Sequence, residues 1–97
     1  MFLSELHRLQ GELFLRNEES DMTKAEQSFR QAIRLAQNQG AKLWELRATV
    51  SLARLLETQG RREEARKALS EIFGWFTGGF DTADLKDAKA LLDELGA

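Results

Sequence analysis

The fold is decided by one stretch of the chain, LARLLETQGRREEARKAL at residues 52–69. Small and apolar residues recur there every three or four positions on both sides of Gly60, which is the spacing of amphipathic helices. Glycine is favoured just after a helix C-terminus, because that position often has a positive φ. The stretch therefore predicts two helices that are joined by a short turn and packed against each other.

An earlier part of the chain carries the same pattern. The corresponding triplets are Ala25, Phe29, Ala32 and Ala65, Leu69, Ile72. In the helices that precede them, Gly11 aligns with Ala53. A small residue there lets two helices approach closely, and the bulky Phe29 or Leu69 fills the space that remains. The repetition predicts stacked helix pairs, because a single pair would leave one of its surfaces unburied.

Helical periodicity extends over the whole chain and predicts an all-α fold. The apolar stripe of the first helix consists of Phe2, Leu6, Leu9 and Leu13. Thr23 and Glu26 have the spacing of a capping box at the start of the second helix, and Gly40 is a natural end for it. We expect a single domain over residues 1–97, built from antiparallel helix pairs and a C-terminal capping helix. The expected segments are about 2–39 and 42–77 for the pairs and about 82–95 for the capping helix.

The C-terminal part of the chain adds a turn and an aromatic cluster. Gly78-Gly79 interrupts the fourth helix, and Asp81 or Thr82 can cap the fifth. The aromatic residues of this region are Phe73, Trp75, Phe76 and Phe80. Because aromatic rings bury large apolar areas, we expect this cluster to anchor the fifth helix on the fourth.

Length and composition limit what these residues do. A chain of 97 residues forms at most one domain. It has no cysteine and a single histidine, which argues against disulfides, thiolate metal sites, histidine zinc sites and catalytic triads. The net charge of −2 provides no basic attraction to nucleic acid or to an anionic membrane. We therefore expect no enzyme activity, no cofactor, no metal site, and neither nucleic acid nor membrane as a partner.

Sequence signals for targeting and for nucleotide binding are absent as well. No apolar run is longer than three residues, far short of a membrane span. The N-terminal residues lack the apolar centre of a signal peptide, so we expect a cytoplasmic protein. The chain has no G-x-x-x-x-G-K-[ST] phosphate-binding loop.

The helix-pair pattern resembles the tetratricopeptide repeat. The residues with that family's spacing are Leu52, Ala53, Leu56, Gly60, Ala65 and Leu69. The distance from Ala25 to Ala65 is 40 residues, against about 34 in the standard repeat. The longer period also suits HEAT-like pairs, but the small-residue positions favour the tetratricopeptide repeat. This resemblance implies a right-handed superhelical stack.

A second resemblance covers most of the chain. The matching stretches are LHRLQGEL at 6–13, AEQSFRQA at 25–32, QGAKLWELRA at 39–48, SLARL at 51–55 and WFTGGFDTADLKDAKALL at 75–92. They are similar to the C-terminal helical end of large bacterial signalling proteins. Those proteins are adenylate/guanylate cyclase-like proteins and transcriptional activators in which an ATPase module precedes a tetratricopeptide array.

This resemblance implies a non-catalytic module for protein–protein interaction or regulation, and we expect the chain to be a piece of such a larger protein. Two alternatives stay open. The chain can be the C-terminal piece of a cyclase-like enzyme whose active site lies elsewhere, or a small stand-alone adaptor.

Tetratricopeptide arrays bind partners chiefly in the groove lined by the first helix of each pair. The positions carried over from that family are Glu5, Arg8, Glu12 and Arg16 in the first pair, and Arg47, Val50, Arg54 and Glu57 in the second. Of these, Arg8, Arg47 and Arg54 are suited to an acidic peptide or a C-terminal carboxylate, because guanidinium groups pair bidentately with carboxylates. The asparagines of the family's peptide-terminus clamp are missing.

The other polar residues have simpler interpretations. We expect His7 to be a packing or surface residue. The basic residues at 61–67 alternate with Glu63 and Glu64, which favours pairing on the helix surface over a nucleic-acid patch.

The first helix is expected to leave apolar surface uncovered. Two helix pairs are fewer than the three or so repeats that such stacks usually need. Phe2, Leu3 and Leu15 can therefore remain exposed where an earlier repeat would pack. We expect a homodimer through the first helix as one remedy.

Overall fold

The computed structural model describes residues 2–16, 22–76 and 83–96, and for Phe2 and residues 14–16 it describes the backbone only. The described residues form five helices and no strand, which confirms the expected all-α class. The helices are α1 (Phe2–Arg16), α2 (Met22–Gln39), α3 (Lys42–Thr58), α4 (Arg62–Phe73) and α5 (Ala83–Glu94).

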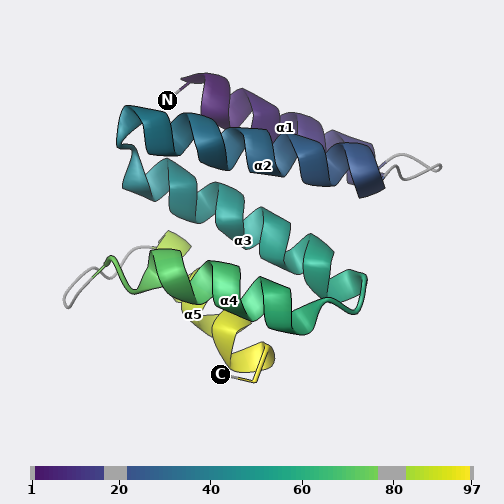
Figure 1. Ribbon diagram of the computed structural model, residues 1–97, viewed down its shortest axis with the longest axis vertical. Helices are drawn as coiled ribbons and strands as arrows, with labels where there is room; N and C mark the ends of the chain where they lie inside the picture. The colour runs from purple at the N-terminus through teal and green to yellow at the C-terminus, as the bar shows by residue number, and fades with distance from the viewer. Residues whose placement is uncertain (1, 17–21, 77–82, 97) are drawn as a thin grey trace.

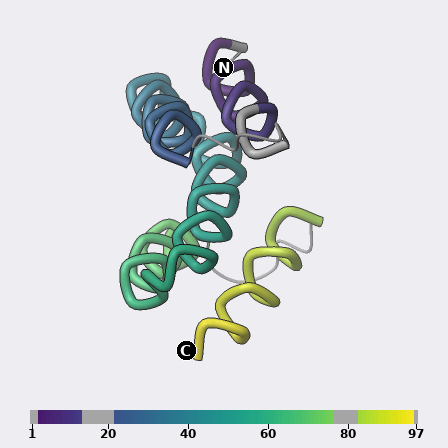
Figure 2. Tube along the Cα trace, turned by 90° about the vertical axis from the view of Figure 1, so that its right-hand side faces the viewer, coloured from purple at the N-terminus to yellow at the C-terminus, as the bar shows by residue number. Residues whose placement is uncertain are grey.

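The helices are arranged around α3. Along the chain, α1 packs on α2, α2 on α3 and α3 on α4, while α3 also contacts α1 and α5. Figure 1 shows α1 to α4 running back and forth one below the other. Figure 2, turned by 90°, shows α1 and α5 on one side of α3 and α2 and α4 on the other. Among the described residues, α1 and α5 do not pack against each other, so α3 forms the floor of a space between them.

Four neighbouring helices bury α3 on most of its surface. Its buried apolar residues are Leu46, Ala48, Leu52, Ala53, Leu55 and Leu56. Three polar residues are buried with them. Thr49 donates a hydrogen bond of 2.7 Å to the carbonyl oxygen of Glu45, one turn earlier. The Glu45 carboxylate accepts hydrogen bonds from Gln37 and Lys42. Side-chain polar atoms buried among the described residues all have partners, as a stable core requires.

The crossing of α1 and α2 depends on Gly11. A Cβ atom at this position would lie 2.5 Å from Cε1 and 2.8 Å from Cδ1 of the Phe29 ring. Phe29 is fully buried, and Gly11 is buried with it. Near the start of the same helix, buried Ser4 donates a hydrogen bond of 2.7 Å to the Ala32 carbonyl oxygen. Small residues therefore form the face of α1 that packs on α2.

The apolar stripe of α1 lies outside the core. Leu6, Leu9 and Leu13 are 41%, 47% and 61% exposed, and Leu3 is 52% exposed. Packing is decided by Ser4 and Gly11, because only small side chains fit beneath Phe29, so the leucines on other faces of the helix are left in solvent. The side chains of Phe2 and Leu15 lie outside the described residues.

Most helix ends agree with the sequence, and two do not. Gly40 and Gly60 have φ values of 66° and 77°, as expected just after a helix. The end of α4 at Phe73, well before Gly78-Gly79, is a correction, because Gly74 takes the C-cap position. The capping box at Thr23 is also wrong, since α2 already begins at Met22. Both residues expected to cap α5 lie outside the described residues.

We predict that Gly11→Ala destabilises the fold. Crowding of the Phe29 ring costs about 1–3 kcal/mol, and the better helix propensity of alanine returns up to about 1 kcal/mol. The second pair has Ala53 and Leu69 at the matching positions, so Phe29→Leu added to Gly11→Ala copies a combination that this fold already contains. Urea unfolding of the single and double variants measures the coupling free energy between the two substitutions. We expect the double variant to be more stable than the sum of the two single effects predicts. Additive losses would contradict a direct steric clash.

Candidate functional site

The candidate site is a groove of about 340 Å³ between α1, α3 and α5. Its lining residues are Arg8, Glu12, Arg47, Val50, Ser51, Arg54, Asp84 and Asp87. Five of these belong to the groove positions expected from the sequence. Half-buried Val50 is the one apolar residue of this lining, and it packs against the core. The structure therefore gathers charged residues from three helices around Val50 and Ser51.

Arg47 is at the centre of the groove. Its Nη1 lies 2.7 Å from Oε2 of Glu5 on α1. Its Nη2 and Nε lie 3.0 Å and 3.3 Å from the two carboxylate oxygens of Asp84 on α5. The guanidinium also lies over the Trp44 ring, 4.8 Å from the ring centroid. Hydrogen bonds to Asp84 and to Glu5 raise the pKa of Arg47, so this side chain is a fixed cation that links three helices.

A second arginine of the groove is also paired. Arg8 forms an ion pair with Glu5, whose other carboxylate oxygen accepts from Arg47. Two of the three arginines expected to receive a partner's carboxylate are thus bound to acids of this chain. Arg54 and Asp87 are exposed and Glu12 is half-buried, and none of the three has an ion pair among the described residues. The charges that remain open to a partner are one cation and two carboxylates.

The other expected groove residues lie outside this lining. Glu5 is at its edge through its ion pairs, whereas Glu57, one turn after Arg54, is not part of the described lining. The side chain of Arg16 lies outside the described residues. Asp84 and Asp87 were not expected in the groove, because local spacing in the sequence does not show that α5 lies opposite α1. Their separation by three residues on a helix was the only available signal that they share a face.

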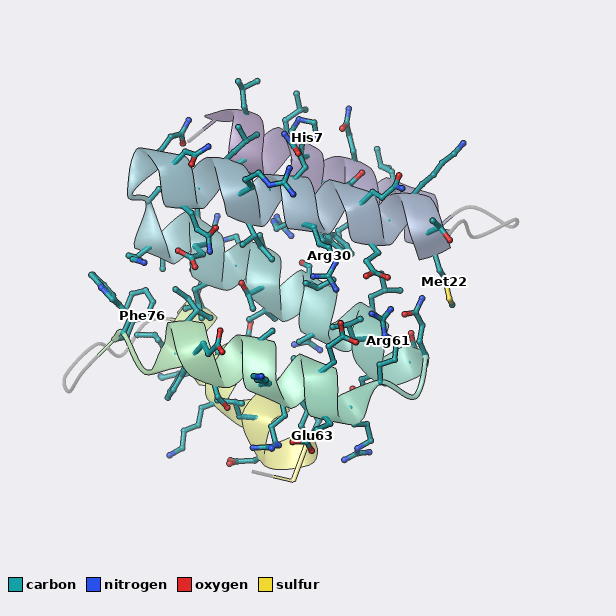
Figure 3. The ribbon with its side chains drawn as sticks, viewed as in Figure 1. His7, Met22, Arg30, Arg61, Glu63 and Phe76 are labelled. Carbon is teal, nitrogen blue, oxygen red and sulfur yellow. The ribbon has the colours of Figure 1, made fainter. Side chains whose placement is uncertain are left out.

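Another charged cluster joins α2 to α4. Arg61, before α4, lies 2.9 Å from Glu26 and 2.8 Å from Glu64. Arg30 on α2 contacts the same two carboxylates at 2.9 Å and 3.2 Å. Figure 3 shows Arg30 below α2 and Arg61 at the start of α4. Arg66 pairs with Glu63 nearby. These contacts support the expected pairing on the helix surface. The pairs Arg61–Glu64 and Glu63–Arg66 are, however, three residues apart and not four.

Burial raises the pKa of Glu26, but hydrogen bonds from Arg61 and then from Arg30 outweigh burial, so the net pKa is below its ordinary value of 4.5. Glu64 also has a lowered pKa, chiefly through its hydrogen bonds with Arg61. All four members of this cluster have partners within it. The cluster therefore holds α2 and α4 together and offers no free charge.

The aromatic cluster differs in part from its expected role. Phe73 and Phe76 are partly buried against the core, but Trp75 is 56% exposed. The Trp75 ring meets Phe76 edge-on, with centroids 5.0 Å apart, and lies 5.7 Å from the ammonium nitrogen of Lys42. Trp75 thus covers the N-terminal end of α3, and Phe80 lies outside the described residues.

Other kinds of site are not found in the part of the chain that the structure describes. No group of three or more acidic or histidine side chains is close enough there to hold a metal ion. None of the described helices is long and apolar enough to cross a bilayer. His7 lines an open hollow between α1 and α2 and is not among the residues that line the groove. Figure 3 shows it at the upper edge of the molecule.

Comparison of the chain with protein-family models, with curated proteins and with solved structures gave no match.

We predict that Arg47→Met destabilises the protein more than Arg54→Met. The first change removes two ion pairs that join helices, worth about 1 kcal/mol in total at this partly exposed site. The second removes an unpaired exposed cation, so its effect stays within about 0.5 kcal/mol. Urea unfolding measures both. Equal stabilities of the two variants would contradict the role of Arg47 as a link.

We predict that Glu26→Gln lowers stability at neutral pH and has little effect in acid. The folded-state pKa of Glu26 is below its unfolded value, so its contribution is complete above the unfolded value and is lost as pH falls through the folded one. Thermal unfolding from pH 7 down to pH 3 should show the two proteins converging. Glu71→Gln, on an exposed glutamate of α4 without an ion pair, is the control and should run parallel to the parent protein.

Proposed function

We propose that this chain is a non-catalytic protein-interaction module that binds a partner in the groove between α1, α3 and α5. One observation carries the proposal: three helices place charges of both signs, three of them unpaired, around the half-buried Val50. The charges provide directional contacts for a partner, and Val50 adds a small apolar contact between them. We further propose that the helices form a right-handed tetratricopeptide-like stack, supported by the expected groove positions that line one hollow.

The unpaired charges define the chemistry of the partner. A carboxylate of the partner can pair with Arg54 without displacing any contact of this chain. The same carboxylate would have to compete with Glu5 or Asp84 to reach Arg47. A basic side chain can pair with Glu12 or Asp87 on the same groove walls. The groove therefore suits a peptide segment that carries a carboxylate at Arg54 and a cation nearby.

The wider context follows from the resemblance of the quoted stretches. We propose a cytoplasmic module that regulates a bacterial signalling or transcription-regulating protein, in which catalysis or DNA binding belongs to other domains. A cyclase-like parent and a stand-alone adaptor use the same groove, so the test of the groove does not depend on which of them is correct.

The groove can be tested with two synthetic peptides of equal length. One ends in glutamates with a free carboxylate, and the other has glutamines and a C-terminal amide. Titration followed by NMR should show the acidic peptide shifting backbone amides near Arg54 and Asp87. We expect Arg54→Glu to weaken this binding about tenfold or more, since it replaces an attraction by a repulsion. Arg34→Glu, an exposed arginine on α2 that does not line the groove, should bind like the parent.

Three outcomes would contradict the carboxylate site. These are binding of the acidic peptide no tighter than that of its amide counterpart, equally tight binding by Arg54→Glu, and an equal loss of binding in Arg34→Glu. The double variant Arg47→Glu/Arg54→Glu should lose binding, and full binding by this variant would exclude the groove. A circular dichroism spectrum confirms in each case that the helices are retained.

A further inference from the structure

A row of leucines on α1 is exposed although the helix is packed on two sides. Leu3, Leu6, Leu9 and Leu13 together expose an area equal to about two whole leucine residues. Gly11, on another face of α1, is buried against Phe29 on α2. The exposed leucines are therefore not on the faces that α2 and α3 cover. This row, Leu3, Leu6, Leu9 and Leu13, is named the leucine face.

Beside the leucine face lies an open hollow of the described surface. It has a volume of about 600 Å³ and is open to solvent between α1 and α2. Its lining residues are His7, Gln10, Leu13, Lys24, Gln27, Ser28 and Gln31. Leu13 belongs both to the leucine face and to the wall of this hollow. A projecting apolar row and an open hollow are therefore next to each other on one side of the molecule.

We propose that a second copy of this chain docks on the leucine face, so that the leucines of each copy enter the hollow of the other. A two-fold dimer needs a surface that is complementary to itself, and a row beside a hollow meets that requirement. This inference is independent of the groove between α1, α3 and α5, which lies on another side of α1 and stays open in the dimer.

Charge favours a second copy over a strongly charged partner. The lining of the hollow contains amides, a hydroxyl and an imidazole, and none of its residues is acidic. Its one lysine, Lys24, already has an electrostatic or hydrogen-bonding partner in this chain. Glu5 and Arg8 of α1 are paired with each other, and Glu5 also with Arg47. The described lining of the hollow therefore brings no carboxylate of one copy against a carboxylate of the other, a contact that would oppose self-association.

The area predicts a weak dimer. A stable specific interface buries about 800 Å² on each partner. The leucine face supplies an apolar centre of about two leucine residues, and the polar lining of the hollow must supply the rest. We therefore expect a reversible dimer whose proportion rises with protein concentration over the micromolar to millimolar range.

Sedimentation velocity of the 97-residue chain over that range provides the test. The double variant Leu6→Glu/Leu13→Glu should weaken the dimer about tenfold or more, because it buries carboxylates in an apolar contact. The matched control is Leu43→Glu, which changes a leucine on α3 that is 38% exposed and lies outside the leucine face. It should dimerise like the parent. Arg54→Glu should also dimerise normally, which separates this test from that of the groove.

Cysteine cross-linking gives a second measurement, because the chain has no cysteine of its own. Leu9→Cys lies within the leucine face and should form a covalent dimer on mild oxidation, whereas Leu43→Cys should react much more slowly. A strict monomer at millimolar concentration would overturn the proposal. So would dimerisation that Leu6→Glu/Leu13→Glu leaves unchanged, or growth into polymers larger than a dimer, since these require a different contact.

Discussion

The burial of α3 by four other helices is the constraint on which the rest of the structure depends. A helix with neighbours on so many sides must carry small or apolar side chains around most of its circumference. Its buried polar groups must find hydrogen-bond partners within the fold. Thr49 meets this demand through a hydrogen bond to the Glu45 carbonyl oxygen within α3, and the Glu45 carboxylate through one from Gln37 on α2. The strip of α3 between α1 and α5 remains open to solvent, and Arg47, Val50 and Arg54 lie along it. The position of the groove is therefore a consequence of how the core is enclosed.

The same packing explains why α1 has its leucines outside. One face of the helix carries the small residues Ser4 and Gly11, and another face is rich in leucine. Close approach to α2 selects the small face, because the Phe29 ring occupies the space that a larger side chain would need. In most surface helices the apolar face is the buried one. In α1 the arrangement is reversed, because the small residues are buried and the leucines are exposed. One face of the helix therefore packs in the core, and the leucine face remains outside it.

The sequence predicts the five helices well, because their periodicity and the glycines at positions 40 and 60 are local signals. Five residues that line the groove are among the positions carried over from the tetratricopeptide resemblance, and their role in binding a partner stays a prediction. The partners of Arg47 could not be predicted, since Glu5 and Asp84 are 42 and 37 residues away and meet it only through tertiary packing. For the same reason, the sequence could not predict that the leucine face is exposed. Periodicity shows that an apolar stripe exists, but not which other element covers it.

Arg47 gives the groove a property that apolar packing would not. Because α1 and α5 are not in direct contact within the described residues, one guanidinium bridges the opening between them. An anion that captured this guanidinium would release both helices from it, and by thermodynamic reciprocity any change that loosened either helix would make the guanidinium easier to capture. Binding in the groove and the attachment of α1 and α5 to Arg47 are therefore coupled, and the positions of these two helices would respond to what the groove holds.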